Sequence, residues 1–201
     1  MNVKHCLVMV ACCAMLTPPV SMLAQDKPMQ DKPVKMAVEG TPISPGDSLN
    51  ALMGLLEEEV VGAADAMPAD KYDFVPSVPG GDFQGVRSFG SQVKHLAQAN
   101  YEFFKGWGVP GEIDPKTLES LKSKDEIMKA LRDSFKFAHA SIDSITTQNA
   151  FTALKQPEAY KATRASMAAL ALAHSMDHYG QMVEYLRMNG IVPPASRKGA
   201  M

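Results

Sequence analysis

Two histidines near the end of the chain, His174 and His178, are four residues apart. In a helix this spacing places both imidazoles on one face, one turn apart. Because an unpaired buried polar group costs roughly 1–3 kcal/mol, each imidazole would need a partner in a core. One divalent metal ion can satisfy both, and histidines at i and i+4 are a known helical metal-binding spacing. Hydrogen bonds from Tyr, Ser or backbone groups can also satisfy them, so the pair alone leaves both interpretations open.

The same pair argues against a peptidase. The metalloprotease motif His-Glu-x-x-His places its general base directly after the first histidine. Here Ser175 stands at that position, and Asp177 projects in a different direction. A zinc peptidase of this type is therefore disfavoured.

A third ligand is available in His95, which lies in the middle of another expected helix beside Val93 and Leu96. Helices in a bundle lie about 8–10 Å apart, so a side chain on a facing helix can reach a metal held by the pair. A half-exposed surface histidine is the alternative interpretation. His139 is interpreted as mainly structural, with a minor chance of lining a pocket. The acidic run of residues 57–59 is interpreted as a solvated helix face.

Four segments must position these residues, and each has apolar residues at alternating spacings of three and four, which is typical of amphipathic helices. The expected helices run over residues 45–67, about 88–106, 124 to about 145, and about 163–189. Ser44 and Ser123 are the expected N-caps of the first and third. No segment shows sustained two-residue alternation, so no sheet is expected. The sequence predicts an all-α four-helix bundle with a long connection between helices 2 and 3.

The N-terminal residues 1–24 have the layout of a secretory signal peptide: Lys4, an apolar run over residues 6–16, and a small residue, Ala24, at the expected cleavage site. The apolar run is too short to span a bilayer stably. We expect export, periplasmic or secreted, with cleavage near Ala24. All 3 cysteines lie in this segment, so the mature chain would contain neither a disulfide nor a thiolate ligand.

The remaining chain is expected to comprise a Pro-rich linker over residues 25–44, the bundle over 45–196 and a tail over 197–201. With 46% hydrophobic residues, the chain can bury a core, which excludes disorder over most of its length. A formal net charge of -2 gives no electrostatic reason to expect a nucleic-acid partner. We expect no nucleic acid and no membrane span in the mature chain, and a homodimer stays open.

Residues 174–181 (His-Ser-Met-Asp-His-Tyr-Gly-Gln), followed by residues 185–187 and 190–194, resemble the terminal-helix signature of DinB-like (YfiT-like) proteins. Residues 67–74 and 87–95 resemble that family's first loop and second helix, and the resemblance covers about residues 46–196. It implies a four-helix bundle whose metal is held by one histidine of the second helix and two of the last. Those positions are His95, His174 and His178. Many members have Arg where Tyr179 stands, so the role of that Arg does not carry over.

Three neutral histidines leave at least one coordination position open to water or substrate. Such a site can lower the pKa of a bound water toward ~7 and polarise a carbonyl group. The ligand set suits one divalent transition metal, zinc or nickel first, with iron, cobalt or copper as alternatives. Gln181, on the histidine face, and Tyr179, directly after His178, are the candidate pocket residues. No general base is assigned.

Three classes of function follow. The first is a metal-dependent hydrolase or transferase acting on an unknown small molecule. The resemblance implies thiol-dependent transferases and a maleylpyruvate isomerase as relatives, but an exported protein would not normally meet the cytosolic thiols that they use. The second is a non-catalytic metal- or ligand-binding module. The third is a structural bundle in which the metal only holds the helices together.

Overall fold

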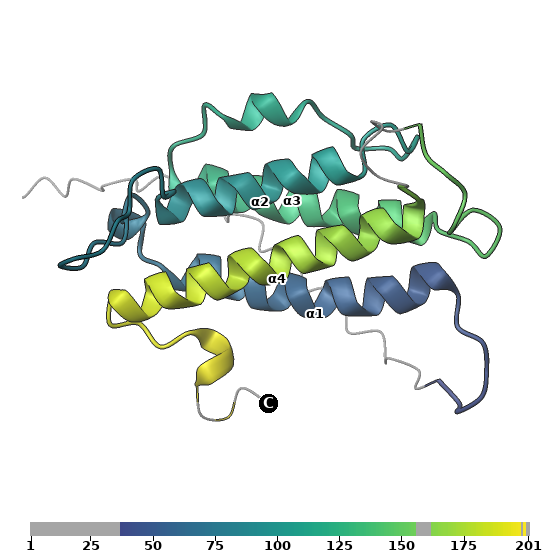
Figure 1. Cartoon of the computed structure of the whole chain (residues 1–201), viewed down its shortest axis with the longest axis horizontal. Coiled ribbons are helices and arrows are strands. Elements are labelled where there is room, and N and C mark those ends of the chain that lie inside the picture. The colour runs from purple at the N-terminus through teal and green to yellow at the C-terminus, as the bar shows by residue number, and fades with distance from the viewer. Residues whose placement is uncertain (1–36, 156–161, 198, 200–201) are drawn as a thin grey trace, which may run out of the picture. The chain divides into compact units, whose positions relative to one another are not determined.

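The computed structural model describes residues 37–155, 162–197 and 199, so the predicted signal peptide and most of the linker lie outside the described residues. Within the unit that begins at Glu39, four long helices pack together (Figure 1). They are α1 (Pro45–Ala66), α2 (Phe89–Phe103), α3 (Lys124–Asp143) and α4 (Arg164–Met188). Short 3-10 helices, η1 (Ala69–Lys71), η2 (Pro115–Leu118) and η3 (Pro194–Ser196), lie in the connections. The described residues form no strand, and the predicted four-helix bundle is confirmed.

All four long helices begin at a hydroxyl side chain that accepts a hydrogen bond from a backbone N–H of the first turn. The N-caps are Ser44, Ser88, Ser123 and Thr163. A cap of this kind stabilises a helix by about 1 kcal/mol because it satisfies one of the unpaired N–H groups at the helix start. The predicted caps Ser44 and Ser123 are confirmed.

In cross-section, the four long helices lie at the corners of a square. Both α1 and α2 pack against α3 and against α4, so α1 lies diagonally opposite α2, and α3 opposite α4. The long connection between α2 and α3 passes through η2, as Figure 1 shows. The core is formed by the inward faces, and its largest fully buried side chains include Phe89, Phe135, Leu131 and Met182. No helix in the described part of the chain is both long and apolar enough to cross a bilayer.

The start of α1 lies very close to the end of α3 at Gly46. A Cβ added to Gly46 would lie 2.9 Å from the carbonyl oxygen of Ile142 and 3.0 Å from that of Ile145. Because both are backbone atoms, neither can move aside without shifting the end of α3. We expect Gly46→Ala to lower the free energy of unfolding by about 1–3 kcal/mol, measured by urea denaturation.

Gly54, in the same helix, is the matched control. No described atom beyond its own chain neighbours and helix backbone lies within 4 Å of a Cβ added there. Since alanine is favoured over glycine in a helix interior by roughly 0.5–1 kcal/mol, Gly54→Ala should stabilise the protein. Stabilisation by both substitutions would show that the contact at Gly46 is not close.

Candidate metal centre

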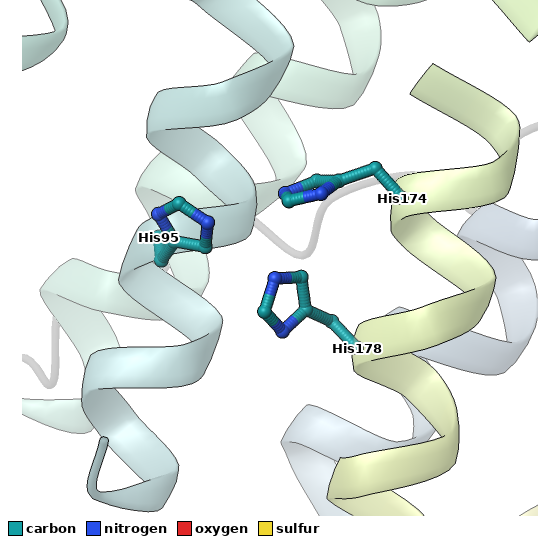
Figure 2. A group of neighbouring side chains, drawn as sticks. All are labelled: His95, His174 and His178. Atoms are coloured by element: carbon teal, nitrogen blue, oxygen red, sulfur yellow. The ribbon is translucent and has the colours of Figure 1, made fainter. Parts of the chain in front are cut away.

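Three histidines meet where α2 packs against α4 (Figure 2). His174 and His178 project from α4, one turn apart, and His95 projects toward them from α2. Each residue offers a ring nitrogen, and the three nitrogens lie within 4.8 Å of one another. The ring centroids are 4.5 Å apart for His174 and His178, and 5.1 and 4.9 Å from His95 to His174 and His178. We call these residues the histidine cluster.

The register of α2 against α4 explains why these residues meet. Three residues before His95, the side-chain amide of Gln92 donates a 2.6 Å hydrogen bond to Gln181 Oε1, three residues after His178. One turn further from the cluster, the rings of Phe89 and Tyr185 lie 6.4 Å apart. Lower numbers on α2 therefore meet higher numbers on α4, so the two helices are antiparallel. This register brings His95 to the turn between His174 and His178.

The nitrogens of the histidine cluster fit a metal ion. His178 is only 5% exposed, while His95 and His174 are half-buried. His174 Nε2 and His178 Nδ1 are buried and have no hydrogen-bond partner among the described residues. Unpaired buried nitrogens of this kind cost roughly 1–3 kcal/mol each, and coordination to a metal would satisfy a ring nitrogen. Neutral imidazole nitrogens are also the ligands that zinc, nickel and similar divalent metals accept.

Burial keeps these imidazoles neutral. It lowers the pKa of His95 to about 4, with the Arg87 guanidinium and His174 acting in the same direction. Burial and the two neighbouring imidazoles lower the pKa of His178 to about 4, against the opposing charge of Asp177. The pKa of His174 is lowered by burial and, to a smaller extent, by Arg87, again against Asp177. Because only a neutral imidazole can coordinate a metal, these shifts favour binding.

We expect His95 and His178 of the metal-free protein to titrate near pH 4, as measured by NMR. Their pKa in the folded state lies below the unfolded value of about 6.5, so the unfolded chain binds more protons between these pH values. The stability of the metal-free protein should therefore fall as the pH drops from about 7 toward 4. Replacing both residues by glutamine should weaken this pH dependence. Midpoints near pH 6.5 in the folded protein would contradict the expectation.

A comparison with protein families gives an independent result. The model of the DinB superfamily, DinB_2, matches residues 55–182. The chain belongs to the DinB superfamily. The matched range begins in α1, ends in α4 and contains all three members of the histidine cluster. The resemblance found in the sequence is thereby confirmed, and this member of the superfamily carries three histidines positioned to bind a metal ion. A search of curated proteins finds no match.

The two candidate pocket residues, Gln181 and Tyr179, have different surroundings in the structure. Gln181 lies at the α2–α4 contact, where it accepts from Gln92 and donates a 3.0 Å hydrogen bond to Asp177. Burial raises the pKa of the Tyr179 hydroxyl group, and the negative charge of Glu59 on α1 acts in the same direction. Gln181 is therefore next to the histidine cluster along α4, whereas Tyr179 is half-buried and packs against the hydrophobic core. Their roles in ligand binding stay predictions.

Two residues near the cluster were missed by the sequence reasoning. Gln92 is 2% exposed, and its Oε1 has no hydrogen-bond partner among the described residues. Its position three residues before His95, on the same helix face, was a usable signal. Arg87 is exposed, and its guanidinium forms no hydrogen bond or ion pair with another described residue. Nothing in the local sequence distinguishes Arg87 from an ordinary surface arginine.

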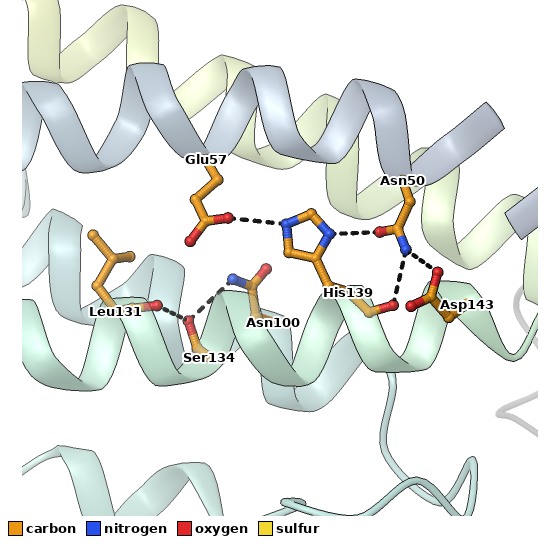
Figure 3. A network of polar contacts seen from close by, with 7 residues as sticks. All are labelled: Asn50, Glu57, Asn100, Leu131, Ser134, His139 and Asp143. Carbon is orange, nitrogen blue, oxygen red and sulfur yellow. Dashed lines mark hydrogen bonds and ion pairs between the residues drawn. The ribbon is translucent and has the colours of Figure 1, made fainter. Parts of the chain in front are cut away.

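His139 is separate from the histidine cluster and connects α3 to α1 (Figure 3). Its Nδ1 lies 2.6 Å from Asn50 Oδ1 and its Nε2 2.9 Å from Glu57 Oε2. Asn50 also donates to the carbonyl oxygen of His139 and to the carboxylate of Asp143. This network supports the structural interpretation of His139. It corrects the interpretation of Glu57 as part of a solvated helix face, because Glu57 is paired with His139 across the helix contact, whereas the neighbouring Glu58 is exposed.

Proposed function

We propose that this protein is an exported, metal-dependent hydrolase or transferase that acts on a small molecule at the histidine cluster. The proposal rests on one observation: among the described residues, three histidines can bind the metal and no fourth protein ligand completes its coordination. No other His, Cys, Asp or Glu of the described residues joins the three nitrogens. Structural metal sites are usually closed by four protein ligands, whereas catalytic sites with three keep a position for water or substrate. The half-buried His95 and His174 support access from solvent.

The metal that we propose is zinc or nickel, with iron, cobalt or copper as alternatives, because the three ligands are neutral nitrogens. When bound, such an ion supplies Lewis-acid chemistry: it lowers the pKa of a bound water toward ~7 and polarises a carbonyl group. The protein's own residues keep the imidazoles neutral through burial and hold α2 and α4 in register through the Gln92–Gln181 hydrogen bond.

Asp177 is a carboxylate whose charge acts on His174 and His178. Its Oδ2 is held by the Gln181 side chain at 3.0 Å. This hydrogen bond fixes the orientation of Asp177, as residues that support a metal site commonly do. We therefore propose Gln181 as a positioning residue of the site.

The proposal is tested by comparing metal-loaded and metal-free protein on a panel of esters, amides and thiol-transfer substrates. Turnover should require the metal and should be lost in His174→Ala while the helical content stays unchanged. Ligand binding without turnover would instead identify a binding module. Loss of stability on metal removal, with neither binding nor turnover, would identify a structural metal. Equal turnover by metal-free protein would contradict the proposal.

Export is tested separately by N-terminal sequencing of the protein from its native compartment. We expect the mature chain to begin at Gln25, after cleavage behind Ala24. A charged residue in the apolar run, such as Val10→Asp, should block export and leave the precursor inside the cell. An intact Met1 on cytoplasmic wild-type protein would refute export.

A further inference from the structure

We propose that Gln92 is a positioning residue of the metal site: its side-chain carbonyl oxygen, Oε1, accepts a hydrogen bond from Nδ1–H of His178 and so presents Nε2 of that ring to the metal. This inference rests on the proposed function, because it concerns the same site. It assigns a role to a residue outside the histidine cluster, which acts through His178 rather than on the metal.

Two buried polar atoms at the contact between α2 and α4 lack a hydrogen-bond partner and have complementary roles. Gln92 is 2% exposed, and its Oε1, which can only accept, has no partner among the described residues. His178 is 5% exposed, and its Nδ1 has no partner among them either. Because an unpaired polar atom in a core is unfavourable, a hydrogen bond between these two would remove both penalties.

A chain of hydrogen bonds fixes which atom of the Gln92 amide is left over. The carboxylate of Asp177, which only accepts, receives a 3.0 Å hydrogen bond from Gln181 Nε2. Gln181 Oε1 then accepts a 2.6 Å hydrogen bond from Gln92 Nε2. Turning the Gln92 amide around would place two carbonyl oxygens against each other. Oε1 is therefore the free atom of Gln92, and the partner that it lacks is a donor.

The His178 ring is oriented to supply that donor. In Figure 2, Nε2 of His178 faces the other two histidines, whereas Nδ1 faces away from them, toward the later turns of α4. A neutral imidazole has one N–H group and one nitrogen with a free lone pair. When Nε2 is the metal ligand, Nδ1 carries the hydrogen and needs an acceptor. Metal-binding histidines commonly donate this hydrogen to a carboxylate or a carbonyl oxygen.

Gln92 lies on the side of the cluster that Nδ1 of His178 faces. The residue to which it is bonded, Gln181, is three residues further along α4 than His178. The hydrogen bond from Gln181 to Asp177 shows that the Gln181 side chain extends back along α4 toward the turn of His178. Oε1 of Gln92 belongs to the amide that is bonded there. The structure has no hydrogen bond between Oε1 and Nδ1, so the bond requires a rotation of the His178 ring as the metal binds.

The experiment uses the full chain, loaded with zinc(II) and isotope-labelled in its histidine side chains for NMR. Wild type should show a signal of His178 Nδ1–H that exchanges slowly with water, because this hydrogen is buried and bonded. Gln92→Met, which has a side chain of similar size without the acceptor, should lose the slow exchange. It should also bind zinc about 10–100-fold more weakly, as measured by calorimetry. Gln92→Glu keeps an acceptor oxygen and should retain the signal and most of the affinity.

Ser175→Ala is the matched control, because Ser175 Oγ is the other buried oxygen without a partner in the described parts of α2 and α4. It should leave the signal and the zinc affinity unchanged. Loss of the signal in Ser175→Ala but not in Gln92→Met would overturn the inference. Lower stability of Gln92→Met with unchanged signal and affinity would show that Gln92 only holds the helices together, and would overturn it while leaving the metal site intact. Failure of wild type to bind zinc would refute the proposed function and the inference with it.

Discussion

Single replacement of His95, His174 or His178 by alanine should remove most of the bound metal. The three ring nitrogens lie within 4.8 Å of one another, so all three can bind one ion. Each histidine is therefore one of three protein ligands. Loss of residues that merely support a metal ligand typically weakens affinity by about 10–100-fold, so loss of a ligand itself should exceed that range. Elemental analysis after dialysis, with calorimetric titration of the metal, measures both stoichiometry and affinity.

His139→Ala is the control for this experiment. It removes an imidazole of the same kind from a helix of the same bundle, but one that is bonded to Asn50 and Glu57 and lies outside the histidine cluster. We expect it to keep the wild-type metal content, even if the contact between α1 and α3 is weakened. Full metal retention in all three cluster variants would contradict the site.

Phe135→Ala should cause one of the largest losses of stability in the fold. Phe135 lies on α3, is 0% exposed and is among the largest fully buried side chains. Truncation of such a residue removes apolar surface from the core and leaves a cavity, which together cost about 3–5 kcal/mol. Since a domain of this kind has only about 5–15 kcal/mol of net stability, a large share would be lost. Urea denaturation monitored by circular dichroism measures the change.

Phe151→Ala provides a matched comparison, because Phe151 is 83% exposed. The same chemical change there should alter the free energy of unfolding by no more than about 0.5 kcal/mol. Similar losses for both variants would show that Phe135 is not packed in the core as the structure places it.

The helices and the cluster could be predicted from the sequence because their signals are local. Apolar spacings of three and four define each helix face, and capping residues such as Ser123 with Glu126 define a start. The spacing of His174 and His178 is also a local property of one helix. His95 required one further assumption, that a facing helix supplies a third ligand, and the antiparallel register of α2 and α4 places it there.

The missed contacts depend on which helices are neighbours and on the register in which they pack. The spacing of apolar residues along the sequence contains neither kind of information. Glu57 and His139 are 82 positions apart, and they meet only because α1 packs against α3. Gln92 and Gln181 are 89 positions apart and meet only in the observed register of α2 and α4. A glutamate on α1 looks the same in the sequence whether it faces solvent or another helix. The position of Arg87 required knowledge of both neighbours and register.

The division of the ligands between α2 and α4 has a consequence for how the molecule matures. α4 follows the other three long helices along the chain and carries two of the three histidines. A polypeptide that breaks off between α3 and α4 contains only His95 of the cluster, and a single imidazole holds a divalent ion weakly. Such a fragment would not retain the ion, even if its helices form. Bound metal would therefore mark the molecules whose synthesis has passed α4 and whose last long helix has docked against α2.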